Sequence, residues 1–200
     1  MLPHHLETKA YHFNVNVHEG TFAHIKTWTI KDPTSKLLHI RLIFKNAGLA
    51  FEKKRGALQL LKSADFGAGS MDAYHFQEFL MNHQVLLYLT PSHDDFIITL
   101  QVPPKNLKYG LQALTLILTQ LKIESGDFKR AQESLLLSYE QAKLEPRSLA
   151  EDYAKDFLYN PHPYLVKYDT MIASIKTLTV EDLKNAIADH LTQDRLCSLS

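Results

Sequence analysis

The polar positions Gln59, Lys62 and Ser63 have the spacing of a helical zinc motif but not its chemistry. In the inverted motif H-x-x-E-H, two imidazoles one helical turn apart bind one metal ion, and the glutamate between them polarises the attacking water. The same spacing, just after residues 56–58, falls on these three residues. A protonated lysine has no lone pair, and a carboxamide and an un-ionised hydroxyl are poor zinc ligands. This helix therefore cannot form a catalytic zinc site by itself.

Other catalytic patterns are absent or weak. The sequence has no Gly-x-Ser-x-Gly nucleophile elbow, and residues 67–70 lack the Gly-Lys-Ser ending of a phosphate-binding loop. The 11 histidines show no metal-ligand spacing, so we interpret them as surface or half-buried residues. The single Cys197 excludes an internal disulfide and a multi-cysteine zinc ribbon, and we expect it to lie in a strand, buried or half-buried.

Composition limits the range of partners and compartments. The 22 basic and 22 acidic residues balance without a block of like charge, which argues against nucleic-acid binding. No apolar window is long enough for a membrane span, and the first residues do not form a signal peptide. The compartment stays open: the periplasm or cell envelope if a leader has been removed, and otherwise the cytoplasm.

The first half of the chain predicts a β-meander followed by two short helices. Strand patterns cover 13–17, 21–30 and 38–44, with a turn at 32–35. Helical spacing then places residues 58, 61 and 66 on one apolar side, and glycines in 67–69 end that helix. A second helix follows an N-cap at Ser70 or Asp72.

The second half predicts a hairpin and then mainly helices. Strands at 85–89 and 96–102 precede a helix that begins at Pro103-Pro104 and runs to 118. Further helices run from 127 to about 144 and from 146 to 158. We expect the aromatic residues that follow to contribute mostly to the core rather than to a peptide-binding surface: Tyr153, Phe157, Tyr159, Tyr164 and Tyr168. Thr179 and Asp182 form a capping box before a final amphipathic helix, and 196–199 ends the chain as a strand.

This order of elements predicts one α+β domain over 1–200, in which helices cover one face of a mostly antiparallel sheet. We find no internal repeat and no linker between domains. We interpret residues 160–163, with the sequence Asn-Pro-His-Pro, as a loop in which His162 is a packing residue.

The element order, together with several local landmarks, resembles the pitrilysin/insulinase family of zinc metallopeptidases, which includes mitochondrial processing peptidase. The landmarks, in order, are Leu42-Ile43-Phe44-Lys45-Asn46-Ala47-Gly48, Gly56-Ala57-Leu58, Gly67-Ala68-Gly69-Ser70-Met71-Asp72, the His-Pro-Tyr segment 157–164 and the helix start 175–183. The resemblance covers about 13–199 and implies the fold of a processing-peptidase domain that is one half of a longer subunit.

The resemblance also implies where remnants of a metal site should lie. The family's third zinc ligand is a glutamate roughly 75 residues past the second histidine of the motif. Here 76 residues separate Ser63 from Glu140, and Glu133 lies two turns earlier on the same face. With the metal gone, Lys62 should neutralise Glu140, directly or through Gln59 and a water.

The lost motif implies a domain that binds no zinc and is not an enzyme, although active relatives use zinc. We expect a chamber wall, substrate contact or scaffold for a catalytic metallopeptidase subunit, or self-association, with peptide as a further ligand. Two alternatives stay open. One is an active metallopeptidase with a displaced or shared metal site, using Glu133, Glu140 and a histidine from elsewhere, and the other is a purely structural assembly subunit.

Overall fold

The structure is a computed structural model and describes residues 16–199. The strand expected over 13–17 therefore lies mostly outside the described residues, and only its last residue, Val17, is seen at the start of β1. The segment expected to be β-rich over 21–30 contains a tight turn, because Ala23 and His24 have positive φ angles of 48° and 66°. This turn connects the first two strands as a hairpin.

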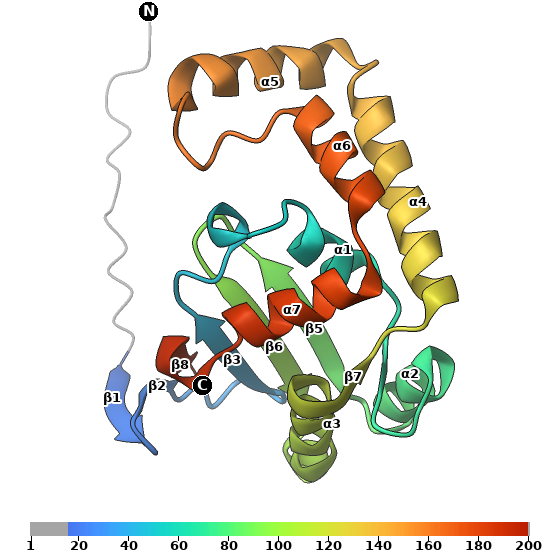
Figure 1. The fold of residues 1–200 in the computed structure, drawn as a ribbon. Coiled ribbons are helices and arrows are strands. Elements are labelled where there is room, and N and C mark those ends of the chain that lie inside the picture. The colour runs from blue at the N-terminus through green and yellow to red at the C-terminus, as the bar shows by residue number, and fades with distance from the viewer. Residues whose placement is uncertain (1–15, 200) are drawn as a thin grey trace, which may run out of the picture.

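A six-stranded sheet forms the centre of the molecule, with the strand order β1-β2-β8-β3-β6-β5 (Figure 1). Its strands are β1 (Val17–Phe22), β2 (Ile25–Ile30), β3 (Leu38–Phe44), β5 (Leu86–Pro91), β6 (Phe96–Val102) and β8 (Leu196–Leu199). Only the β2–β8 pair is parallel. Strand β8 thus lies between β2 and β3, so the first and last strands of the described residues belong to one sheet.

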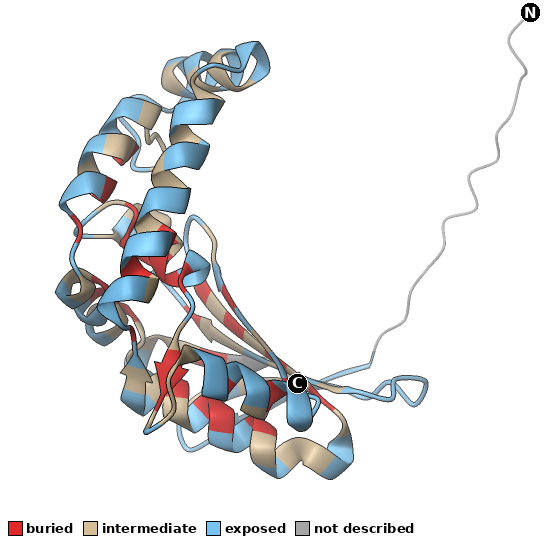
Figure 2. Cartoon of the chain, turned by 90° about the vertical axis from the view of Figure 1, so that its right-hand side faces the viewer, coloured by how far each residue is buried: buried red, intermediate tan, exposed pale blue. Residues whose placement is uncertain are grey.

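The seven α-helices of the described residues lie on one side of this sheet (Figure 2). They are α1 (Ala57–Ser63), α2 (Ala73–Asn82), α3 (Leu107–Gln120), α4 (Ser125–Ala142), α5 (Pro146–Tyr159), α6 (Tyr168–Thr177) and α7 (Val180–His190). Short 3₁₀ helices occupy Leu49–Phe51, Pro104–Asn106 and Gln193–Arg195. The expected α+β fold, with helices covering one face of a mostly antiparallel sheet, is confirmed.

Strand β6 shows why the helices pack against only one face of the sheet. Its residues alternate strictly, with Phe96, Ile98, Leu100 and Val102 buried and the intervening side chains partly exposed. Helix α3 packs closely over this strand, because a Cβ at Gly110 would lie 3.2 Å from Leu100. The buried side of β6 therefore forms the floor of the core.

Helices α4, α5 and α6 extend beyond the sheet (Figure 1). Helix α5 has no buried residue, and Tyr153 and Phe157 are 75% and 89% exposed. The expectation that the aromatics belong to the core is wrong for Tyr153, Phe157 and Tyr159, because α5 lies at the far end of the helical extension, where no sheet covers it. Tyr164 and Tyr168, which follow α5, are half-buried. His162 does pack within its loop, with its ring 4.4 Å from that of Tyr164.

Two further features differ from the sequence prediction. Helix α1 ends at Ser63, so Phe66 is not part of it, and Gly67–Ala68 instead forms the small strand β4 with β7 (Leu121–Lys122). Helix α6 was not predicted at all. The Thr179–Asp182 capping box, the N-cap at Asp72 and the buried position of Cys197 are all confirmed.

Candidate functional site

Helix α1 is fixed in place by residues on its N-terminal side. Gly56, the residue before it, has φ of 89°, and a Cβ there would lie 2.9 Å from Ile175. Glu52 provides the cap: its carboxylate accepts the backbone N–H of Gly56 at 3.1 Å and of Leu58 at 2.6 Å. Burial raises the pKa of the Glu52 carboxyl, while these N–H groups and Arg55 act in the opposite direction.

The positions expected to carry the lost motif lie on the side of α1 away from its buried leucines. Gln59 is half-buried, whereas Lys62 and Ser63 are exposed. The Ser63 hydroxyl donates to the Gln59 carbonyl at 2.9 Å, within the helix itself. Of the three, only Gln59 faces another helix.

That helix is α4, and the residue that meets Gln59 is Tyr139. The Tyr139 hydroxyl donates to Gln59 Oε1 at 2.5 Å, and burial raises the pKa of this hydroxyl. Helix α6 supports the arrangement, because the Gln132 amide donates to the Ile175 carbonyl at 2.7 Å and the Ser174 hydroxyl donates to the Arg55 carbonyl at 2.7 Å. Side-chain hydrogen bonds thus connect α4 to α1 and to α6, and connect α6 to the loop just before α1.

The acidic residues expected near Lys62 have other partners. Glu140 lies 4.0 Å from Lys176 Nζ on α6, and Glu133 lies 3.9 Å from Lys129 one turn earlier on α4. Within residues 16–199, Lys62 makes no ion pair. The expected direct Lys62–Glu140 contact is therefore wrong: α4 turns Tyr139, not Glu140, towards α1, because Tyr139 continues the apolar stripe of Phe128, Ala131 and Leu135.

In the described part of the chain, no cluster of three His, Cys, Asp or Glu side chains is arranged to hold a metal ion. The same residues contain no helix with the length and apolarity needed to cross a membrane. The chemistry that the α1–α4 contact offers is a neutral hydrogen bond between a phenol and a carboxamide.

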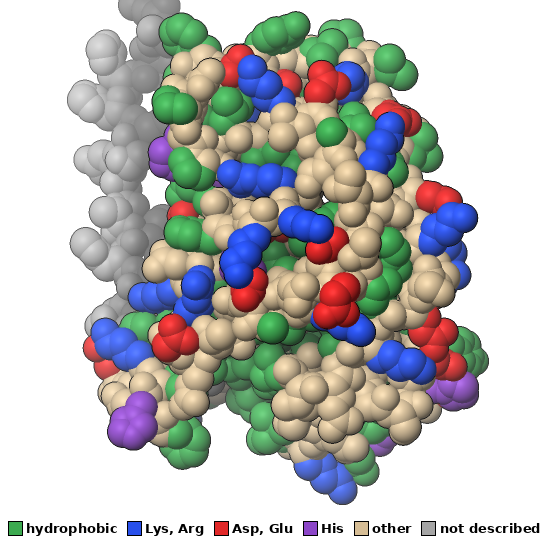
Figure 3. All heavy atoms as spheres, viewed as in Figure 1, with side chains coloured by type: hydrophobic (Ala, Val, Ile, Leu, Met, Phe, Trp, Pro, Cys, Tyr) green, Lys and Arg blue, Asp and Glu red, His purple; other side chains and the backbone are tan. Residues whose placement is uncertain are grey.

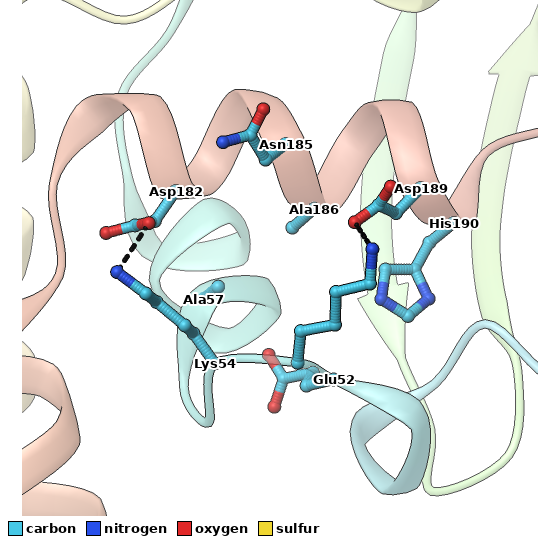
Figure 4. Close-up of a pocket in the computed structure, with 9 residues that line it drawn as sticks. Glu52, Lys54, Ala57, Asp182, Asn185, Ala186, Asp189 and His190 are labelled. Atoms are coloured by element: carbon cyan, nitrogen blue, oxygen red, sulfur yellow. Dashed lines mark ion pairs between the residues drawn. The ribbon is translucent and has the colours of Figure 1, made fainter.

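A second feature lies beside the N-terminal end of α1, where a cavity of about 330 Å³ separates the loop 52–54 from α7 (Figure 4). Two ion pairs bridge it: Lys54 Nζ lies 2.8 Å from Asp182, and Lys53 Nζ lies 2.7 Å from Asp189. Figure 3 shows basic and acidic side chains interspersed on the side of the molecule that faces the viewer in Figure 1. Neither the cavity nor its two ion pairs is indicated by a local sequence pattern.

His190, the last residue of α7, forms one end of this cavity. It is 4% exposed and is the single buried polar or charged residue among those described. Its Nδ1 has no hydrogen-bond partner. Burial lowers the pKa of His190, Arg195 lowers it further, and Asp189 raises it.

Comparisons with known proteins identify the fold. No protein-family model and no curated protein sequence matches the chain. Among solved structures it is similar to a peptidase M16 inactive domain from Pseudomonas fluorescens, with TM-score 0.81 and 19% identity over 92% of this chain and 46% of that one. A protease from Helicobacter pylori gives TM-score 0.77 and 13% identity over 93% and 46%. The periplasmic protease PqqL from Escherichia coli gives 0.75 and 14% over 92% and 21%.

The chain therefore has the fold of M16 peptidase domains, as its landmarks predicted. It spans less than half the length of each of these three proteins.

Proposed function

We propose that this chain is a non-catalytic domain of the peptidase fold, which serves as wall and scaffold for a catalytic metallopeptidase partner. The observation that carries the proposal is the Tyr139–Gln59 hydrogen bond, at the point where the resemblance predicts a zinc site. A phenol donating to a carboxamide neither binds zinc strongly nor activates water. One of the structures with this fold is itself described as an inactive domain.

The uncovered face of the sheet supports association. On it, Leu86 and Tyr88 of the edge strand β5 are each 47% exposed and lie beside Gln101 and Thr99 of β6. The neighbouring positions of β3 are His39 and Arg41. A sheet face with exposed apolar residues next to an edge strand is a surface that proteins usually cover.

The direct test pairs the chain with a defined partner, the product of an adjacent reading frame that carries an intact H-x-x-E-H. The proposal predicts a stable complex in size-exclusion chromatography with light scattering, and faster peptide hydrolysis by the complex than by the partner alone. A complex with unchanged hydrolysis would favour a purely structural subunit. Hydrolysis by this chain alone, sensitive to chelators, would favour the displaced-site enzyme.

A matched pair of variants locates the contact. Tyr88→Lys places a charge on the open sheet face, whereas Tyr74→Lys does so on α2, where Tyr74 is 73% exposed. We expect the first to weaken the complex about tenfold or more, because burying an unpaired charge in an interface is unfavourable. Equal affinities for both variants would show that the open face is not the interface.

A further inference from the structure

We propose that the cavity between loop 52–54 and α7 binds a short peptide with free termini, oriented by opposite charges at its two ends. The cavity of about 330 Å³ lies within the volume range of small-ligand sites. Its middle is lined by the small side chains of Ala57 and Ala186, which leave room between the two ion pairs (Figure 4). Binding here does not depend on the proposed catalytic partner.

The carboxylates of the cavity are not equally available. Both oxygens of Glu52 accept backbone N–H groups at the start of α1. Asp182 accepts from Thr179 in the capping box and pairs with Lys54. Asp189, by contrast, has one cationic partner among the described residues, the largely exposed Lys53.

The end of the cavity at Asp189 therefore suits an ammonium group. His190 lines the same end of the cavity, and because burial lowers its pKa the ring adds no positive charge there at neutral pH. The C-terminal end of a helix carries partial negative charge, so the end of α7 at Asp189 and His190 favours a cation.

The opposite end suits a carboxylate. Lys54 has one carboxylate partner among residues 16–199, and its ammonium carries three N–H groups. Asn185, which also lines the cavity, supplies an amide donor. Figure 4 shows Lys54 and Asp182 at one end of this face of α7 and Asp189 and His190 at the other.

The spacing of the two ends selects the length of the ligand. Asp182 and Asp189 are seven residues apart on α7, which corresponds to about 10 Å along the helix axis. An extended chain rises about 3.3 to 3.6 Å per residue, so a tripeptide separates its termini by about 10 Å. A free amino acid is too short to reach both ends.

The test is a titration of the isotopically labelled full chain with tri-L-alanine, followed by amide chemical shifts. We expect saturable shifts at Ala57 and along 185–190, and binding at least about tenfold weaker for N-acetyl-tri-alanine amide, which lacks both charges. Asp189→Asn should also weaken tri-alanine binding about tenfold, and Lys184→Met, on the exposed side of α7, should leave it unchanged.

Three results would each overturn the proposal. One is the absence of saturable shifts up to about 50 mM peptide, a concentration above any useful affinity. The others are equal binding of the blocked peptide, or tri-alanine binding that Asp189→Asn leaves unchanged. If the variant does not fold, the comparison of the two peptides on the unaltered chain decides the question.

Discussion

The Tyr139 hydroxyl on α4 donates a hydrogen bond of 2.5 Å to Gln59 Oε1 on α1. Gln59 is one of the three positions to which the sequence resemblance assigns the lost metal motif, and the bond joins the two helices that the resemblance predicts to carry metal ligands in an active relative. Half-buried polar groups need partners, and here the side chains of two uncharged residues satisfy each other.

Removing this hydrogen bond should destabilise the fold. Tyr139→Phe leaves the ring in place but deprives the half-buried Gln59 amide of its donor, so we expect the free energy of unfolding to fall by about 1 kcal/mol. Urea denaturation measures it. Tyr153→Phe is the matched control, because Tyr153 is 75% exposed, and its effect should be near zero. Equal effects of the two variants would contradict the structural role of Tyr139.

Lys62 should contribute little to stability. Its side chain is exposed and makes no ion pair within the described residues, so Lys62→Met should change the free energy of unfolding by less than about 0.5 kcal/mol. Glu140→Gln should also have a small effect, since Glu140 and its partner Lys176 are both more than half exposed. If Lys62→Met lowered the free energy of unfolding by more than about 1 kcal/mol, Lys62 would have to form a buried ion pair with a carboxylate.

His190 should make stability depend on pH. Its pKa in the folded chain lies below the usual 6.5, chiefly because of burial, so the unfolded chain binds a proton first as pH falls. The stabilisation is present above pH 6.5 and is lost as pH falls below that value towards the folded pKa. Asp189 opposes this shift, while Lys53 and Arg195 reinforce it.

Urea denaturation at about pH 7.5 and about pH 5.5 tests this prediction. In His190→Gln the loss of stability between the two values should be smaller than in the unaltered chain. His75→Gln, at an exposed histidine paired with Asp72, serves as the control. If the His190 and His75 variants keep the same pH dependence as the unaltered chain, the burial of a neutral His190 is not its source.

The sequence predicted those elements whose signals are local. Strand alternation located β6, and the Thr179 and Asp182 side chains marked the start of α7. Helix α6 was missed although Tyr168, Met171, Ile172 and Ile175 follow the i, i+3, i+4, i+7 spacing of an amphipathic helix, so the signal was present in the sequence. Strand β4 was not predicted, because it consists of two small residues that form a strand only by pairing with Leu121–Lys122, far along the chain.

The α1 residues of the candidate site were named from the sequence, but their partner on α4, Tyr139, was not. Counting residues from a family motif placed Glu140 opposite α1, whereas a difference of one residue rotates a helix by about 100°. The apolar stripe that begins at Phe128 and continues to Tyr139 indicates which side of α4 faces the rest of the molecule, and Glu140 is not on that side. The cavity beside His190 depends on loop 52–54 meeting α7 across more than a hundred residues, and no local pattern indicates such a contact.

The metal content of the purified chain tests the central claim most directly. After mild chelation and dialysis, elemental analysis by mass spectrometry should find far less than one zinc per chain, because Gln59, Lys62 and Ser63 supply neither imidazole nor carboxylate. The same sample should not hydrolyse an unstructured peptide. About one tightly held zinc per chain, together with chelator-sensitive hydrolysis, would contradict a non-catalytic role.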